Sequence, residues 1–477
     1  MIDKYYNGVI EQVVSGIGNV EHNSILVRYS NDFSIWDLES VNHYKDQTDI
    51  FFTCHEFSYN KIAEAYEPYL GLIRQMFHKY CSGTLEEFME ECDVYKLQRP
   101  VFESYFENGF CERTEQILID EVEYEQERMH SSIVTMLQKL SEICPIVIVL
   151  NRFQLASKST MQLTNRLLQT KNKNIGIVLG VNDVQSIPEF AHEEWDAICE
   201  SMDDRNMVYH IGNAGRNMEP DVMDYYSDYE SDDGYRKLNN LVYFLDFDQA
   251  NHHLSKIERR IKFDNFTISE KKHYQLLLLQ IMVSVLQRDI AKALESCEDL
   301  EKMQYQEKEG AFYYNFWMAT SYMYLGKLEE AMIYVQKAKE CGEALGDDFL
   351  VFRAELLKAQ NQMSGWCNIF FCAQDIEISD KLIEKLNAYH YKNHLAHIYI
   401  YAYDNKPEIV AKAYRSEAFL IYFSKGVALA KEIGNEQLIS IAYRKNIMIA
   451  STNGEYEVSL LYSIRTYEAM KDVDSVE

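Results

Sequence analysis

Five short apolar runs in the first 215 residues constrain the fold of this chain more than any other feature. They are rich in Ile, Val and Phe, and they span Ser24–Tyr29, Thr48–Glu56, Pro145–Leu150, Ile175–Val181 and Met207–Gly212. Amphipathic helical stretches separate them, at Lys61–Cys81, Glu112–Cys144 and Thr160–Lys171. Nearly continuous apolar strands that alternate with helices are typical of a parallel sheet covered on both faces. The sequence therefore predicts an α/β domain over residues 1–215.

The α/β pattern ends at an acidic segment, Glu219–Tyr235, which contains seven acidic residues and no Lys or Arg. Such a run usually lies in a solvated loop. An acid-lined ion site is the alternative, but the spacing of the acids fits no calcium-binding loop. We expect residues 216–239 to form a linker between two domains.

The rest of the chain has the pattern of helical repeats. No proline occurs from Asp221 to Lys406, so nothing in this stretch interrupts helical periodicity. The clearest repeat, Asn315–Glu340, matches a tetratricopeptide helix pair at its small and aromatic positions, which are Ala319, Tyr322, Gly326, Ala331 and Ala338. Weaker units place Ala250 and Ala293 where Ala331 stands, and Gly454 where Gly326 stands. We expect an all-α tetratricopeptide-like superhelix over residues 240–477.

The segment Ile146–Leu168 carries a recognisable motif. An apolar strand runs into Asn151 and Arg152, and Gln154, Ala156 and a leucine-rich helix follow. This pattern resembles the Walker B region of the signal-transduction ATPases, the STAND class of AAA-related proteins, notably the large LuxR-type regulators and cyclase-linked ATPases. The resemblance implies a P-loop-NTPase-like α/β domain followed by tetratricopeptide-like repeats.

The acidic residues of that motif are missing here. By the resemblance, Asn151 occupies the position of the magnesium-linked acid, Arg152 that of the water-activating acid, and Ser157 that of a later Asp. One carboxylate is needed to hold the hydrated Mg²⁺ and another to orient the attacking water. An amide is neutral, and a guanidinium opposes the metal. We therefore expect a pseudo-ATPase that is not an enzyme and uses no cofactor.

The phosphate-binding half of the site is altered as well. A P-loop needs glycines, so that consecutive backbone amides can wrap the phosphates, and a lysine for their charge. The segment from Asn19 to Leu70 contains no glycine, and Gly-Lys followed by Ser or Thr occurs nowhere in the chain. Arg28 could contact a phosphate, but Tyr29–Trp36 is too bulky to cradle one. The alternative function is a nucleotide-dependent STAND switch or ATPase whose site departs from this pattern.

The concave face of the repeats is the expected working surface. Counted from Ala319, the inward side chains of one repeat helix are Tyr313, Phe316, Thr320, Met323 and Tyr324. This aromatic, adaptable set suits a peptide or helix, and ordinary packing between repeats is the alternative. The resemblance implies protein–protein interaction for such arrays. We expect a signalling scaffold with a role in regulation, whose partner is a protein, a peptide or a second copy of the chain.

Composition excludes several other functions. The formal net charge of -28 would repel a phosphate backbone, so we expect no direct binding of nucleic acid. No apolar run approaches the roughly 20 residues that span a bilayer, and the N-terminus does not resemble a signal peptide. The ten cysteines form no CxxC pair. These features favour a cytoplasmic protein without membrane insertion.

Three histidines form the one metal-capable pattern. His390, His394 and His397 fall on one face of a predicted helix, which is a spacing that can bind a metal. No Glu follows the first histidine as in HExxH, so we expect polar or stacking histidines and no metal. A metal enzyme based on these histidines is a third option.

Overall fold

The computed structural model describes most of the chain. The described residues are 2–18, 23–29, 35–45, 47, 49–58, 61–109, 111, 122–182, 191–203, 208–211, 229–263, 266–303, 308–364, 380–401, 417–452 and 454–470. Their contacts divide the chain into two compact units, each described separately below. The first comprises 1–94, 98–112 and 125–269, and the second comprises 95–97, 113–124 and 270–477.

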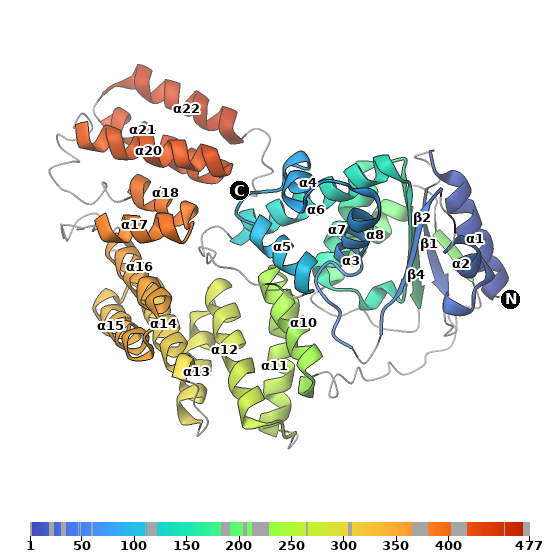
Figure 1. The fold of residues 1–477 in the computed structure, drawn as a ribbon, viewed down its shortest axis with the longest axis horizontal. Coiled ribbons are helices and arrows are strands. Elements are labelled where there is room, and N and C mark those ends of the chain that lie inside the picture. The colour runs from blue at the N-terminus through green and yellow to red at the C-terminus, as the bar shows by residue number, and fades with distance from the viewer. Residues whose placement is uncertain are drawn as a thin grey trace. The chain divides into compact units, whose positions relative to one another are not determined.

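A five-stranded sheet forms the core of the first unit (Figure 1). The strands are β1 (Ser24–Tyr29), β2 (Phe51–Glu56), β3 (Ile146–Asn151), β4 (Ile175–Asn182) and β5 (Val208–Ile211). Their order is β2-β3-β4-β1-β5, and every neighbouring pair is parallel. All residues of β3 and β4 are buried, because these inner strands are covered on both faces. The predicted parallel α/β domain is confirmed, and each of the five apolar runs overlaps one strand.

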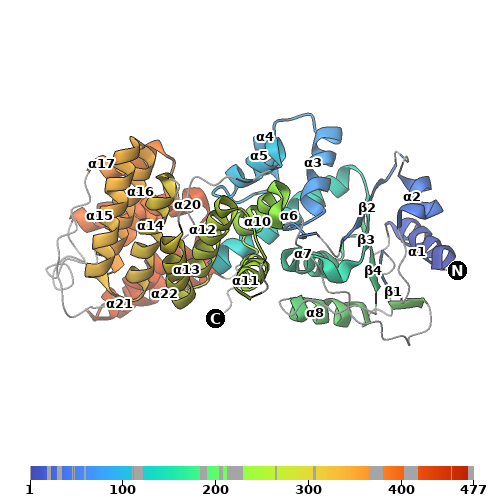
Figure 2. The same cartoon turned by 90° about the horizontal axis from the view of Figure 1, so that it is seen from below.

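Helices cover both faces of this sheet. The helices of this part of the chain are α1 (Ile2–Gly16), α2 (Glu39–Tyr44), α3 (Tyr69–Tyr80), α4 (Leu85–Glu91), α5 (Arg99–Asn108), α6 (Val122–Ile143), α7 (Lys158–Thr170) and α8 (His192–Asp203), with short 3-10 turns η1 (Ile35–Asp37) and η3 (Phe153–Leu155). Helices α1 and α2 lie on one face, and α3, α7 and α8 lie on the other (Figures 1 and 2). Helix α1 approaches β4 closely, because Gly180 has no side chain. A Cβ there would lie 2.2 Å from the Tyr6 hydroxyl oxygen.

Two further helices belong to the first unit, at a place where the sequence predicts something else. Helices α10 (Asp232–Tyr243) and α11 (Phe247–Phe263) fall in the stretch assigned to the linker and the first repeats. Helix α10 begins at the Ser231 N-cap, whose hydroxyl accepts a hydrogen bond from the Gly234 N–H, and Asp232 and Asp233 fill its first turn. Acidic side chains stabilise a helix N-terminus. The last acids of the acidic segment therefore start a helix, and residues 219–228 lie outside the described part.

The main part of the second unit, from residue 270 onward, is entirely helical where it is described. Its helices are α12 (Glu270–Leu286), α13 (Ile290–Lys302), α14 (Lys308–Tyr324), α15 (Leu328–Leu345), α16 (Asp348–Ser364), α17 (Asp380–Ala388), α18 (Lys392–Tyr401), α20 (Glu417–Ile433), α21 (Glu436–Thr452) and α22 (Tyr456–Met470). Neighbours along the chain pack on one another, as α14 with α15 and α21 with α22 (Figure 1). Gly326 and Gly454 turn the chain between the two helices of these pairs, with φ of 71° and 75°. The predicted all-α repeat region is confirmed.

Membrane crossing by a helix has no support in this structure. Within the described ranges, every helix is too short or too polar to span a bilayer.

Candidate functional site at the carboxyl edge of the sheet

The carboxyl ends of β3, β4 and β1 lie side by side in the sheet. In open α/β sheets, ligands bind outside this edge. The register pairs Tyr29 with Asn182 and Leu150 with Leu179, so the ends of β1 and β3 flank the end of β4. Three of the predicted site residues, Arg28, Asn151 and Arg152, therefore come from this edge. Their side chains point in different directions.

Asn151 turns toward the face covered by α1. It is fully buried, and its Oδ1 accepts a hydrogen bond of 2.8 Å from the Tyr29 hydroxyl. Its Nδ2 has no hydrogen-bond partner among the residues that the structure describes. An amide N–H is a donor and cannot bind Mg²⁺, which takes oxygen ligands. The residue that the sequence analysis predicts at the magnesium-linked position is therefore a buried amide with one hydrogen-bonded oxygen.

Arg152 follows β3 directly and adopts a left-handed conformation with φ of 54°. Its Nη1 lies 3.3 Å from Oε1 of Glu56, the last residue of β2. The two side chains are 18% and 10% exposed. The carboxylate at the neighbouring strand end is thus paired with the guanidinium.

Ser157 caps helix α7. Its side chain is fully buried, and its hydroxyl oxygen accepts a hydrogen bond of 3.1 Å from the Thr160 N–H. Capping satisfies a backbone donor that the helix itself leaves unpaired. A serine is a common N-cap, so the sequence contained a signal for this helix start, although the helix predicted from the sequence begins later, at Thr160.

Arg28 is directed to the opposite face of the sheet from Asn151. Its Nη2 lies 3.2 Å from Cys199 Sγ, and its guanidinium carbon lies 5.8 Å from the centroid of the Trp195 ring, both on α8. Successive residues of a strand point to opposite faces, so Arg28 and Tyr29 cannot reach the same group. The four residues predicted to form a degenerate nucleotide site do not converge on one point.

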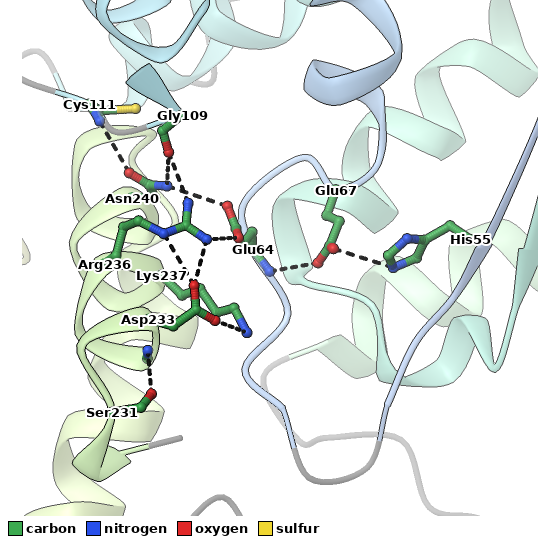
Figure 3. Close-up of polar contacts among 11 residues, drawn as sticks. His55, Glu64, Glu67, Gly109, Cys111, Ser231, Asp233, Arg236, Lys237 and Asn240 are labelled. Atoms are coloured by element: carbon green, nitrogen blue, oxygen red, sulfur yellow. Dashed lines mark hydrogen bonds and ion pairs between the residues drawn. The ribbon is translucent and has the colours of Figure 1, made fainter. Parts of the chain in front are cut away.

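A polar network that the sequence did not predict lies at the end of β2 (Figure 3). Glu64 accepts hydrogen bonds from Arg236 Nη2 at 2.9 Å and from Asn240 Nδ2 at 3.3 Å. Glu67 accepts a hydrogen bond from the Glu64 N–H at 3.1 Å, and its other oxygen lies 3.5 Å from His55 Nε2. The network ties α10 to the chain that leaves β2. The sequence analysis missed Glu64 and Glu67 because it predicts one helix over Lys61–Cys81. In the structure α3 begins only after Pro68, at Tyr69, so both acids precede the helix.

Burial sets the charges in this network. It raises the pKa of the Glu64 carboxyl, and the nearby Arg236 guanidinium partly offsets that effect. Burial also raises the pKa of Glu67, and it lowers the pKa of His55 to about 4. His55 is therefore neutral at pH 7. Chemically, the network can hold α10 in place.

The histidines of the third option are not arranged as the sequence predicts. His390 has a φ of 59° and precedes α18, which begins at Lys392, so it does not share a helical face with His394 and His397. In the described part of the chain, no three His, Cys, Asp or Glu side chains are grouped to hold a metal ion.

The predicted partner-binding residues on α14 differ in accessibility. Phe316, Thr320 and Met323 are buried, each less than a tenth exposed, because they pack between helices. Tyr313 is half-buried beneath the Arg353 guanidinium, and Tyr324 is 38% exposed. Three of the five side chains thus offer no free surface.

Comparison with known proteins gives one finding. This chain is similar in structure to a STAND protein. The solved structure is that of a signal transduction ATPase with numerous domains that carries a tetratricopeptide repeat sensor, from Pyrococcus horikoshii. The sequences are 12% identical, the match covers 96% of this chain and 82% of that chain, and the TM-score is 0.40. No protein family model matches the sequence, and no curated protein matches it.

Proposed function

We propose that this protein is a non-catalytic signalling scaffold, a pseudo-ATPase, that works in the cytoplasm by binding a protein or peptide partner through its helical repeats. The observation that supports this proposal is how the two residues at the end of β3 are bonded. Asn151 is buried and bonded to Tyr29, and Arg152 is paired with Glu56.

Charge is the physical reason. Phosphoryl transfer from ATP needs Mg²⁺, which binds carboxylate oxygens, and a group that orients the attacking water. Arg152 brings a positive charge to the end of β3, next to the residue that the resemblance assigns to the magnesium-linked acid, and its ion pair engages the Glu56 carboxylate at the neighbouring strand end. Metal binding there would need a rearrangement of this edge.

The repeats supply the partner-binding surface of this proposal. Tyr324 is exposed on α14 and Tyr313 is partly so, and aromatic side chains are frequent anchors in protein interfaces. The buried Phe316, Thr320 and Met323 support the shape of that surface from beneath.

A titration with Mg·ATP tests the pseudo-ATPase proposal. With about 1 mM Mg·ATP and a dissociation constant above about 1 mM, the ligand would stabilise the folded state by less than about 0.4 kcal/mol, which is a negligible thermal shift. We expect no measurable calorimetric binding and no phosphate release. Micromolar binding or turnover would overturn the proposal.

The second candidate function, a nucleotide-dependent switch, has one observation in its favour. The buried Asn151 Nδ2 has no partner within the described residues, and such a donor could meet a phosphate oxygen. The same titration separates the two functions, because this candidate requires binding that weakens in Asn151→Ala.

Partner binding needs its own test. Proteins captured from the native cell by the intact chain should be lost with Tyr324→Ala and kept with Lys337→Ala, a substitution on the adjacent helix α15. Equal capture by both variants would argue against the α14 surface.

A further inference from the structure

The last described helix, α22, carries most of its large apolar side chains on its exposed side, although Tyr462 packs on a buried cluster. Its exposed residues include five large apolar or aromatic ones, Tyr456 (74%), Leu460 (63%), Leu461 (47%), Ile464 (48%) and Tyr467 (72%). The side that packs on α21 carries Ser459, which is 8% exposed and bonded to the Ser451 hydroxyl at 2.8 Å. A helix at a protein surface normally shows the opposite pattern.

Helix α15 is a matched reference for α22, because both follow a glycine turn of the same kind. Ala331 follows Gly326 by the same number of residues as Ser459 follows Gly454. Ala331 and Ser459 are both buried. A cation–π pair also occurs at corresponding positions of the two helices. Lys337 Nζ lies 4.7 Å from the centroid of the Tyr334 ring, and Arg465 Cζ lies 5.6 Å from that of Tyr462.

This register shows what is unusual about α22. Where α15 has Gln336 and Lys339, α22 has Ile464 and Tyr467. Gln336 bonds to Glu340 on the surface, and Lys339 pairs with Glu355 of the next helix. Contiguous apolar surface of this kind marks an interaction site.

We propose that the exposed face of α22 is the interface between two copies of this chain, packed antiparallel about a two-fold axis at Leu461. Charge complementarity selects this occupant. With Leu461 on the axis, Glu457 of one copy faces the partner's Arg465, and the symmetry makes both pairs at once. A parallel arrangement would instead set Glu457 against Glu457 and Arg465 against Arg465.

The area is sufficient for such a dimer. The exposed fractions of the five residues correspond to roughly 600 Å² per copy and about 1,200 Å² in total, which is the lower end of specific interfaces. By helical spacing, Glu457 and Arg465 flank Leu461 one turn before and one turn after it, so the residues of both Glu–Arg pairs start from the same side of the helix as Leu461.

The oligomeric state of the full chain tests this interface. Sedimentation over about 1–200 μM should show a monomer–dimer equilibrium, and Leu461→Asp should raise the dissociation constant at least about tenfold. Ile333→Asp, at the matched exposed position of α15, is the control and should leave the dissociation constant of the dimer unchanged. Circular dichroism checks that both variants fold.

A charge exchange tests the antiparallel register. Glu457→Arg and Arg465→Glu should each weaken the dimer alone, because like charges then face one another. Mixed together they should associate, because every introduced arginine faces a glutamate.

Several results would overturn this proposal. The wild type could stay monomeric, which is expected if a different protein covers α22. Ile333→Asp could weaken the dimer as much as Leu461→Asp. The mixture of the two charge variants could fail to associate. The proposal does not depend on the pseudo-ATPase function, so its failure would leave the Mg·ATP titration unaffected.

Discussion

Arg152 is the single residue that most changes the chemistry of the carboxyl edge. A guanidinium is charged at every accessible pH, and its planar group suits a carboxylate. It lies beside a Glu56 side chain that is only 10% exposed. The pair is poorly solvated, so each partner depends on the other for the neutralisation that water would provide elsewhere.

Removing this arginine should therefore destabilise the first unit. Arg152→Ala removes the guanidinium beside the nearly buried Glu56 carboxylate, and we expect a loss of about 1–3 kcal/mol in the free energy of unfolding, measured by urea denaturation. Lys139→Ala is the matched control, because Lys139 and Glu91 form a pair that is 41% and 65% exposed. It should change stability by less than about 0.5 kcal/mol. Equal losses would show that the Arg152 pair is no stronger than a surface pair.

Asp246 is a second residue whose charge is costly. It is buried between α10 and α11, and its Oδ2 accepts a hydrogen bond of 2.9 Å from the Ser159 N–H. Burial raises the pKa of this carboxyl from 3.8 to about 6. Between these values the folded state holds a proton that the unfolded state has lost, so the contribution of Asp246 to stability falls as the pH rises through this window.

Asp246→Asn removes that dependence. The amide oxygen can still accept from the Ser159 N–H, and there is no charge to bury. We expect the variant to be more stable than the wild type by about 1–3 kcal/mol at pH 7.5 and nearly equal to it at pH 4. Urea midpoints at both pH values measure the difference. A variant that is less stable at pH 7.5 would contradict the assignment.

The sequence predicts the position of the site residues better than their orientation. Asn151 and Arg152 were placed at a strand end because an apolar run stops there, and the structure agrees. Arg28 contacts α8 because its side chain points to the face of the sheet that α8 covers. A strand buried on both faces does not reveal this in its sequence. The contacts of Glu64 with Arg236 join segments far apart in the chain, which no local pattern contains.

At the scale of elements, local pattern predicted the helices and strands, and local chemistry explains the differences. The predicted helix over residues 61–81 begins only at Tyr69, because Pro68, its N-cap, has no N–H to donate within a helix and disfavours helical backbone in the residue before it. The acidic segment was interpreted as a linker from its charge alone. Its last acids, Asp232 and Asp233, instead follow a Ser N-cap, which is a helix-start signal.

The packing of α1 on β4 depends on a small residue. A Cβ at Gly180 would lie 2.2 Å from the Tyr6 hydroxyl oxygen and 2.6 Å from Asn151 Oδ1. Gly180→Ala should therefore displace α1 and cost about 1–3 kcal/mol or more. Gly71→Ala is the control, because a Cβ at Gly71, inside α3, meets nothing within 4 Å. It should stabilise the protein by up to about 1 kcal/mol.

Thermal unfolding and hydrogen exchange of α1 measure these changes. Faster exchange in α1 of the Gly180→Ala variant alone would show that the contact holds this helix. An unchanged exchange rate would contradict it.

At the scale of the whole molecule, the net charge opposes any association of two copies. Each chain carries -28 at pH 7. Two such charges at a separation on the order of 60 Å repel by tens of kcal/mol in water without salt. Screening reduces this to about a tenth at 0.01 M salt, where the Debye length is about 30 Å, and to a negligible value at 0.15 M, where it is about 8 Å.

The dimer at α22 should therefore strengthen as salt is added from 0.01 to 0.15 M. The two Glu457–Arg465 pairs would favour the opposite trend, but exposed ion pairs contribute at most about 1 kcal/mol each. The residual repulsion at low salt is several times larger, so it decides the sign. Sedimentation at both salt concentrations measures the dissociation constant, and Leu461→Asp should remain monomeric in both. A dimer that weakens over this range would show that local ion pairs outweigh the net charge and would contradict this prediction.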